Sequence, residues 1–334
     1  MKDKYILAIE TSCDETSVAI VRNGHQEISS VIMSQIDIHA KFGGVVPEIA
    51  SRNHETNITW ALEKTLADAG LTMHDIDAIA VTEGPGLIGS LLIGITTAKT
   101  LAWLYQKPII PVHHIAGHIY AANLEKSMQF PLMALVVSGG HTELIIMKED
   151  YQFEKIGSTL DDAVGEAYDK VARILTAGYP GGPAIEKLAR TGKDTYDLPL
   201  PLDDGSFNFS FSGIKSAVVN LTHREKQKGR QININDLALS FQNRVIAILT
   251  KKTIKAMQHY EISNLILVGG VAANQALRNS LKNECQKHDF SFMVPKLLNC
   301  TDNATMIGAA AYFAYNLGHH EKKFKPKSVI DLNN

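Results

Sequence analysis

Two stretches of the sequence repeat one pattern, and this repeat restricts the fold more than any other feature. Each stretch has two apolar segments separated by a short turn of polar residues or glycine: residues 5–9 and 17–21 in the first stretch, and residues 132–137 and 143–147 in the second. Aliphatic segments bounded by such turns predict strands, so each stretch predicts a β-hairpin. The recurrence of the hairpin indicates a chain built from two similar halves.

Further segments extend the first hairpin into an α/β lobe. Residues 50–69 and 88–105 have helical patterns, and residues 76–81 predict a strand. The chain of 334 residues is longer than a typical domain of roughly 100 to 200 residues. We therefore expect two lobes, residues 1–125 and residues 126–334, with a final helix that could pack back on the first lobe.

The second hairpin leads into similar elements. Residues 161–175 predict a helix, and residues 178–183, rich in glycine and proline, predict a loop. Residues 265–268 predict a strand, after which Gly269 and Gly270 precede a helix that begins near Asn274. A strand, a glycine turn and a helix in this order suit a phosphate group at the helix N-terminus. We therefore expect an α/β protein with a duplicated actin-like ATPase fold and a ligand cleft between its two lobes.

Motifs and composition argue against several classes of protein. The sequence has neither the GxxxxGK[ST] string of P-loop proteins nor a GxGxxG string after a strand. The apolar run that ends at Ile9 is too short for a signal peptide core, so we expect no signal peptide, and no apolar run approaches the roughly 18 residues that span a bilayer. Its three cysteines, Cys13, Cys285 and Cys300, have no CxxC spacing, which fits a reducing compartment. We expect a cytoplasmic protein with no membrane contact, and the formal net charge of −2 implies that any RNA contact is local.

Two histidines suggest a metal site. His114 and His118 are four residues apart, so on a helix their imidazoles lie on one face about one turn apart. Asp302 is the best candidate for a third ligand, because two histidines and a carboxylate suit Fe(II), Zn or Mn and leave coordination positions open. Asp302 could instead cap the helix expected to begin near Ala304, a role open also to Thr301 and Asn303. No HExxH motif is present, which disfavours a metalloprotease mechanism.

Eight short strings of the sequence, spread over nearly the whole chain, resemble the motifs of one known family. They are residues 9–16 (IETSCDET), 44–52 (GVVPEIASR), 83–87 (EGPGL), 137–142 (VSGGHT), 181–183 (GGP), 211–215 (FSGIK), 269–274 (GGVAAN) and 301–303 (TDN). In this order, and with the pair His114 and His118, they resemble the TsaD family, which makes N6-threonylcarbamoyladenosine in tRNA. The family was formerly described as O-sialoglycoprotein endopeptidases.

The resemblance implies an acyltransferase of the actin-like ATPase superfamily. Its reaction moves the threonylcarbamoyl group from threonylcarbamoyl-AMP to N6 of adenosine 37, in tRNAs that read codons beginning with A, and releases AMP. By resemblance, His114, His118 and Asp302 hold one divalent metal ion, usually iron, with zinc as an alternative. Threonylcarbamoyl-AMP, or ATP or AMP, would be held by a second set of residues. These are Val137, Ser138, Gly139, Gly140, His141, Asp169, Gly182, Glu186 and Asn274. Glu186 departs from the family pattern, which usually has Asp there.

Attack by an exocyclic amine requires loss of a proton, so a general base would assist the transfer. Asp14, Glu15 and His141 are the candidates, and the sequence does not rank them. The resemblance also implies a heterodimer with a TsaB-like paralogue through the N-terminal lobe, a TsaE-like ATPase as a further partner, and tRNA as the substrate. Two groups of basic residues could contact tRNA phosphates. They are Lys215, Arg224, Lys226, Lys228 and Arg230, and Lys322, Lys323, Lys325 and Lys327.

Three alternative functions make different predictions. An actin-like ATPase or kinase would turn over ATP without tRNA and would not need His114. A non-catalytic scaffold subunit would be expected to lack the metal ligands. An O-sialoglycoprotein metalloendopeptidase would need a nucleophile or base for peptide cleavage, and the sequence offers none that is evident.

Overall fold

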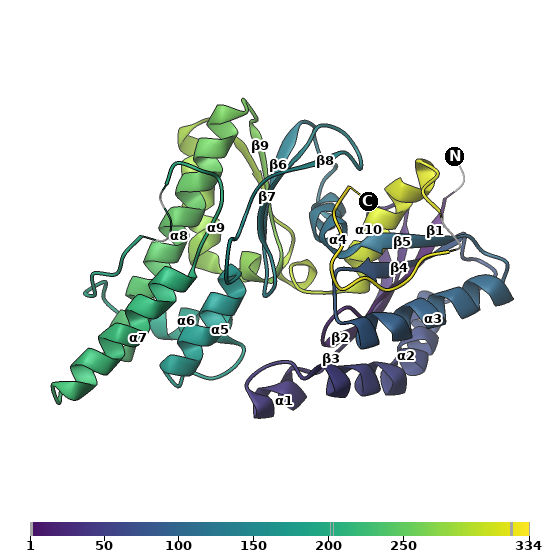
Figure 1. Cartoon of the computed structure of the whole chain (residues 1–334). Coiled ribbons are helices and arrows are strands. Elements are labelled where there is room, and N and C mark those ends of the chain that lie inside the picture. Colours follow the sequence, from purple (N-terminus) through teal and green to yellow (C-terminus); the bar gives the residue numbers. More distant parts are fainter. Residues whose placement is uncertain (1–2, 201, 203, 321–322, 334) are drawn as a thin grey trace. The chain divides into compact units, whose positions relative to one another are not determined.

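A computed structural model gives the fold as two compact units (Figure 1). The structure describes residues 3–200, 202, 204–320 and 323–333. Unit 1 comprises Met1–Met128, Glu149–Phe153 and Pro295–Asn334, and unit 2 comprises Gln129–Lys148 and Glu154–Val294. This division differs from the expected lobes, 1–125 and 126–334, mainly at the C-terminal end. Residues from Pro295 onward cluster with unit 1 because helix α10 (Ala304–Asn316) packs on the sheet of that unit.

Unit 1 is built on a five-stranded mixed sheet with the order β3-β2-β1-β4-β5. The strands are β1 (Tyr5–Glu10), β2 (Glu15–Arg22), β3 (Gln26–Ser34), β4 (Ala78–Gly84) and β5 (Ile109–His113). The first three strands pair antiparallel, whereas β4 pairs parallel with both β1 and β5. The carboxyl ends of β1, β4 and β5 therefore lie at one edge of the sheet, where Glu10, Glu83 and His113 are found.

Helices cover both faces of this sheet, and small residues let one of them approach closely. Besides α10, the helices of unit 1 are α1 (Ile36–His39), η1 (Ala40–Phe42), α2 (Pro47–Ala69), α3 (Ile88–Leu104), α4 (His114–Tyr120), η2 (Ala121–Leu124) and η4 (Leu297–Asn299). Leu7 and Ile9 pack in one apolar cluster with residues of α2 and α3. Ala8 faces the opposite side, because successive side chains of a strand alternate. A Cβ added at Gly308 of α10 would lie 2.6 Å from Val21 Cγ2. The yellow helix α10 accordingly lies directly against the strands (Figure 1).

Unit 2 repeats the topology of unit 1. Its sheet has the order β10-β9-β6-β7-β8, with β6 (Leu132–Val137), β7 (Thr142–Met147), β8 (Phe153–Ser158), β9 (Asn264–Val268) and β10 (Ser291–Met293). Strand β6 pairs antiparallel with β7 and parallel with β9, and β9 pairs parallel with β10. Each sheet is thus a three-strand meander extended by two parallel strands, which confirms the duplication expected from the two hairpins.

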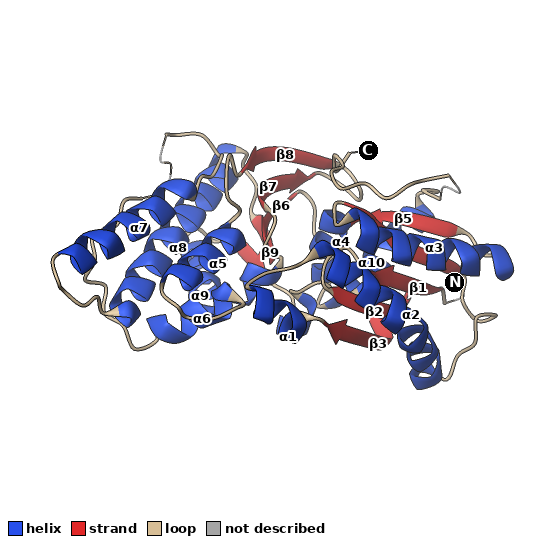
Figure 2. Cartoon of the chain, turned by 60° about the horizontal axis from the view of Figure 1, so that its bottom comes forward, coloured by secondary structure: helices blue, strands red, loops and turns tan. Residues whose placement is uncertain are grey.

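The helices of unit 2 are α5 (Val164–Ile174), α6 (Gly181–Ala189), α7 (Ser212–Gln227), α8 (Ile234–His259), η3 (Gly270–Ala273) and α9 (Gln275–Lys287). Figure 2 shows both units as mixtures of helices and strands, as expected for an α/β protein. Among the described residues, no helix is long and apolar enough to cross a membrane.

Two sequence predictions for unit 2 were wrong in part. The segment 178–183 was expected to be a loop throughout, but α6 begins at Gly181. Proline is tolerated in the first turn of a helix, where its missing N–H would have no intrahelical partner. The helix expected from residue 161 begins at Val164; the side chains of Asp161 and Asp162 instead contact Ser212 and Lys215 in the first turn of α7.

Candidate metal centre and ligand-binding loops

The short helix α4 places two histidine side chains side by side. Strand β5 ends at His113, whose extended backbone and side chain cap α4, since His113 Nδ1 accepts the Ile115 N–H at 3.1 Å. His114 and His118 then lie one turn apart on α4, with ring centroids 4.7 Å apart. The structure therefore places both histidines on one helix face, as their spacing predicts.

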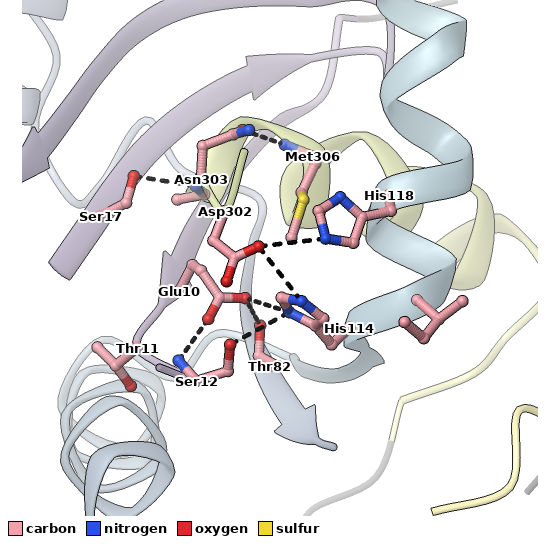
Figure 3. Close-up of polar contacts among 12 residues, drawn as sticks. Glu10, Thr11, Ser12, Ser17, Thr82, His114, His118, Asp302, Asn303 and Met306 are labelled. Atoms are coloured by element: carbon pink, nitrogen blue, oxygen red, sulfur yellow. Dashed lines mark hydrogen bonds and ion pairs between the residues drawn. The ribbon is translucent and has the colours of Figure 1, made fainter. Parts of the chain in front are cut away.

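Asp302 completes a three-residue cluster. Its carboxylate Oδ1 lies 3.4 Å from His114 Nε2 and 3.2 Å from His118 Nε2. Asn303, not Asp302, is the N-cap of α10, because Asn303 Oδ1 accepts the Met306 N–H at 2.8 Å. One ligand atom from each of the three residues lies within 4.8 Å of the others. The cluster has the donor set and spacing to hold a metal ion (Figure 3).

Close packing of α4 against α10 brings these ligands together. A Cβ added at Gly117 would lie 2.7 Å from Ile307 Cδ1. Gly117 stands between the two histidines on α4, and Ile307 follows Asp302 by little more than one helical turn. Glycine at residue 117 therefore permits the helix approach that the cluster requires.

A set of polar side chains lies on the Nδ1 side of His114: Glu10, Ser12 and Thr82. The sequence analysis did not identify them as site residues. Glu10 Oε2 lies 3.2 Å from His114 Nδ1, and Ser12 Oγ lies 3.2 Å from the same nitrogen (Figure 3). Thr82 Oγ1 donates to Glu10 Oε2 at 2.5 Å, and the Ser12 N–H donates to Glu10 Oε1. A carboxylate behind a metal-binding histidine orients the ring and raises its basicity. The sequence feature that could have identified Glu10 is its place as the last residue of a buried apolar strand.

The charges of this buried cluster are coupled. Burial opposes a charge on His114, but the neighbouring carboxylates of Asp302 and Glu10 outweigh it and hold the pKa of His114 well above its ordinary value. Burial also favours neutral carboxylic acids, yet His114 lowers the pKa of Glu10 and holds that of Asp302 well below its usual range. The site therefore combines two carboxylates with one positive charge on an imidazole. It is built to hold positive charge.

For His118, burial outweighs the attraction of Asp302 and Glu10 for a positive charge. Its side chain is fully buried, and neither ring nitrogen has a hydrogen-bond partner among the described residues. Burial lowers its pKa, so the ring is neutral near pH 7. A neutral, buried imidazole with its Nε2 directed at a carboxylate is a ready metal ligand. The residues present thus fit a divalent metal ion.

The two acidic candidates for a general base also lie in unit 1, Asp14 at the end of the turn after β1 and Glu15 as the first residue of β2. Asp14 is buried and its carbonyl accepts the Gln35 N–H at 3.0 Å. Burial, with the charges of Asp302 and Asp14, raises the pKa of Glu15 to about 9. Glu15 Oε1 accepts a hydrogen bond from Ser34 Oγ at 3.2 Å. His141, the third candidate, lies in unit 2.

In unit 2, the turn between β6 and β7 has an ordered glycine loop. The Ser138 N–H donates to the His141 carbonyl at 2.8 Å, and the His141 N–H donates to Ser138 Oγ at 3.1 Å. Gly139 and Gly140 are exposed, and a Cβ at either would meet no atom within 4 Å. The N-terminal end of α5 lies directly beside this turn, because the Gly165 N–H donates to the Ser138 carbonyl at 3.1 Å. Backbone of this kind, next to a helix N-terminus, suits an anion.

The other expected ligand residues surround the ends of β6 and β9. Gly269 has a φ of +94°, and a Cβ there would lie 2.4 Å from the Val137 carbonyl oxygen. Asn274 caps α9 through its Oδ1, which accepts the Leu277 N–H at 2.9 Å, while its Nδ2 donates to Gln242. The side chain of Asn274 thus has two structural contacts, which position the helix N-terminus.

Two acidic candidates connect α6 to neighbouring helices. Asp169 Oδ1 accepts the Gly181 N–H at 2.7 Å, at the start of α6. Gly182 follows, and a Cβ there would meet no atom within 4 Å. Glu186 Oε1 accepts the Gln275 N–H at 3.1 Å, at the start of α9. The longer side chain of Glu186 therefore reaches the N-terminus of the next helix.

The comparisons with known proteins identify the family. A family model described as "TsaD: tRNA N6-adenosine threonylcarbamoyltransferase" matches residues 26–309. The chain belongs to the TsaD family. The tRNA N6-adenosine threonylcarbamoyltransferase of Staphylococcus carnosus (strain TM300) is 57% identical over 318 residues, which cover 95% of this chain and 93% of that protein. The protein of the same description from Staphylococcus aureus (strain JH9) is 55% identical over 333 residues, covering 99% of this chain and 98% of that protein.

Solved structures agree on the fold. The activator of 2-hydroxyisocaproyl-CoA dehydratase from Clostridium difficile, with bound ADPNP, superposes with a TM-score of 0.54 at 15% identity, covering 94% of this chain and 96% of that chain. Full-length HypF superposes with a TM-score of 0.63 at 13% identity over 94% of this chain, which spans 46% of the HypF chain. These neighbours have the actin-like ATPase fold, which confirms the fold expected for this TsaD family member.

The FSGIK string of this TsaD family member serves to join α7 to the loop before α5. Asp161 Oδ1 accepts the Phe211 N–H at 2.8 Å, and hydrogen bonds from Ser210 and Ser212 lower the pKa of this exposed carboxyl. Lys215 Nζ lies 2.7 Å from Asp162 Oδ2. Lys215, expected among the basic residues that could contact tRNA, is therefore paired within unit 2.

Other basic residues of the two groups are also paired. Glu225 lies between Arg224, Lys228 and Arg230, at 3.3 to 3.7 Å. Lys327 pairs with Glu83 at 2.9 Å. Lys322 lies outside the described residues. Local pairing of this kind reduces the net positive charge that these groups offer to a phosphate backbone.

Proposed function

We propose that this chain transfers the threonylcarbamoyl group from threonylcarbamoyl-AMP to N6 of adenosine 37 of tRNA, as its TsaD family membership suggests. In this reaction the amine nitrogen bonds to the carbamoyl carbon, the bond from that carbon to the phosphate oxygen breaks, and AMP leaves with the electron pair. The amine gives up a proton. The observation that carries the proposal is family membership over most of the chain, together with the intact His114, His118 and Asp302 cluster.

We propose that the cluster holds one divalent metal ion, with iron favoured and zinc as the alternative. His114 Nε2, His118 Nε2 and an oxygen of Asp302 would be its ligands, and Glu10 would hold the His114 ring in place through Nδ1. A bound metal supplies Lewis-acid polarisation of substrate oxygens and a fixed point for their orientation. The ion would also supply the positive charge that a proton on His114 otherwise provides.

The adenylate part of the substrate would bind to unit 2. The loop from Val137 to His141, with the N-terminus of α5 behind it, offers backbone N–H groups and a helix dipole to a phosphate. Gly182 leaves open space for close approach of a ligand to the start of α6. Asp169, Glu186 and Asn274 act in this proposal mainly by holding α6 and α9 in place, through the hydrogen bonds described above.

The raised pKa of Glu15 bears on the choice of base. With a pKa of about 9, Glu15 holds its proton near neutral pH and can donate a hydrogen bond but not accept a proton. We therefore favour Asp14 or His141 over Glu15 as the group that accepts the amine proton.

We propose that a TsaB-like paralogue binds unit 1 and that a TsaE-like ATPase is a further partner. We also propose that the protein acts in the cytoplasm, where tRNA is modified. Large apolar side chains are exposed on α2 and α3, which pack against each other. They are Trp60, Ile88, Leu92, Trp103 and Leu104. Several large apolar side chains exposed on two neighbouring helices are a feature of protein–protein interfaces and support the first of these partners.

The proposed transfer is tested with unmodified tRNA, threonylcarbamoyl-AMP, the metal-loaded protein and its proposed partners. Nucleoside mass spectrometry would detect threonylcarbamoyladenosine, and AMP would be measured in parallel. We expect equal amounts of both products with the native protein and neither with His114→Ala. ATP turnover without tRNA and without dependence on His114 would favour the ATPase or kinase reading. Absence of product with verified partners would favour a scaffold.

A further inference from the structure

A segment that follows α10 in the sequence runs over the edge of the unit 1 sheet. We call residues 324–330 the strap. Phe324 is buried in the apolar cluster beneath α2 and α3. Lys99 Nζ lies 4.3 Å from the centre of the Phe324 ring and also donates to the Phe324 carbonyl. The start of the strap is therefore anchored by both apolar burial and a charged hydrogen bond.

The middle of the strap lies on the carboxyl end of β4. The Lys327 N–H donates to the Glu83 carbonyl at 3.0 Å, and Lys327 Nζ pairs with Glu83 Oε1 at 2.9 Å. A Cβ at Gly84 would lie 2.2 Å from the Lys327 carbonyl oxygen. Glycine at residue 84 thus permits direct backbone contact between the strap and the end of this strand. Three residues after Gly84, the Leu87 N–H donates to the Ser12 carbonyl at 2.8 Å, in the turn whose Ser12 hydroxyl contacts His114.

The end of the strap reaches His113. The Ile330 carbonyl oxygen lies 3.3 Å from His113 Nε2, while His113 Nδ1 accepts the Ile115 N–H at the start of α4. A carbonyl oxygen can only accept a hydrogen bond, so His113 Nε2 must carry the proton. In a neutral ring the other nitrogen, Nδ1, is then an acceptor, which is the form that the helix cap requires.

We propose that the strap is a positioning element of the metal centre, acting through His113. The Ile330 carbonyl selects the His113 tautomer and ring orientation that cap α4, and α4 carries both histidines of the cluster. Residue 113 contacts no substrate or metal in this proposal, so it is a positioning residue. The inference rests on the proposed metal role for its effect on metal binding, but the tautomer and its dependence on the strap are independent of any metal.

The test compares the full chain with a chain that ends at Lys327, which keeps Phe324 and Lys327 but loses Ile330. Co²⁺ alone is the probe, and its affinity is measured by absorption titration. Loss of a helix cap predicts binding about fivefold weaker in the shortened chain. His113→Asn provides the matched control, because asparagine caps a helix without needing a selected tautomer. We expect chains with His113→Asn to bind Co²⁺ with the same affinity whether or not residues after Lys327 are present.

A second readout uses protein labelled with ¹⁵N-histidine and no added metal. Long-range proton–nitrogen correlation spectra report the tautomer of each ring, and the signal lost in His113→Asn assigns residue 113. We expect the Nε2–H form in the full chain and a mixture of tautomers in the shortened chain. An Nδ1–H form in the full chain, or the same tautomer in both chains, would overturn the proposal. The proposal would also be overturned if shortening the chain weakened Co²⁺ binding equally in the native sequence and in His113→Asn.

The two readouts separate this inference from the proposed function. If the full chain binds no Co²⁺, the metal role fails while the tautomer spectra still decide whether the strap holds His113. If Co²⁺ binds but its affinity does not depend on the strap, the metal role stands and the positioning role is rejected.

Discussion

Nε2 of His118 lies 3.2 Å from Oδ1 of Asp302, yet neither nitrogen of that fully buried ring has a hydrogen-bond partner among the described residues. Buried polar groups without partners are rare in folded proteins and usually have a functional explanation. Here the neighbouring His114 supplies a further nitrogen directed at the same carboxylate. A metal ion would satisfy all three side chains together.

Replacement of His118 by alanine should abolish metal binding without unfolding unit 1. Even the hydrogen-bond partners of metal ligands contribute about 10- to 100-fold to affinity, so loss of a direct ligand should exceed that range. Metal content measured by elemental mass spectrometry should fall to background. His74→Ala is the matched control, because His74 is exposed and should leave metal content unchanged. Retention of metal by His118→Ala would exclude His118 as a ligand.

Glu10→Gln tests the support of His114. Glutamine keeps an oxygen that can accept the Ser12 N–H but removes the negative charge beside His114 Nδ1. We expect metal affinity to fall about 10- to 100-fold, since this carboxylate orients and polarises the ligand ring. Competition with a chromophoric chelator would measure the change. Glu48→Gln, an exposed helix residue, should show native affinity, and native affinity in Glu10→Gln would remove Glu10 from the account.

A pair of glycine variants tests the loop after β9. Gly269→Ala requires an alanine at a φ of +94° with its Cβ 2.4 Å from the Val137 carbonyl oxygen, so it should destabilise the protein by about 1–3 kcal/mol or more. Gly270→Ala meets no atom within 4 Å and should change stability by no more than about 1 kcal/mol. Urea unfolding would compare the two variants. Equal midpoints would show that the loop can relax to accept a side chain.

The pH dependence of stability reports on Glu15. Its pKa is raised from 4.5 to about 9 on folding, so folding favours the protonated side chain. The stability that this contributes is present in full below the unfolded pKa and is lost as pH rises toward about 9. The side chain in Glu15→Gln cannot ionise. The melting temperature of this variant minus that of the native protein should therefore increase from pH 5 to pH 8, with chelator present throughout. A melting-temperature difference that stays constant with pH would contradict a raised pKa.

Much of the fold could be predicted from the sequence, because alternating or continuous apolar segments determine strands locally. The segment Leu132–Val137 is one example, since its predicted and observed bounds agree. The start of α6 could not be predicted in this way. Gly181 and Pro183 are typical of loops, and the group that stabilises the helix start, Asp169, lies twelve residues earlier and contacts Gly181 only in the folded chain.

The metal cluster, too, could be predicted only in part. The four-residue spacing of His114 and His118 is a local signal, and Asp302 could be proposed from its place before a helix. The choice between ligand and cap needed the structure, which assigns the cap to Asn303. Glu10 was missed because its partner, His114, is distant in sequence and a carboxylate at a strand end is ordinarily solvated. The roles of the adenylate-binding residues in ligand contact stay predictions.

The most direct measurement of the central claim is metal-dependent transfer by one protein preparation. Threonylcarbamoyladenosine would be quantified by nucleoside mass spectrometry after incubation of tRNA and threonylcarbamoyl-AMP with native protein, with protein stripped by chelator, and with stripped protein resupplied with Fe²⁺ or Zn²⁺. We predict that stripping removes the product and that one of the two ions restores it, with no restoration in His118→Ala. Equal product from stripped protein of verified low metal content would contradict the account.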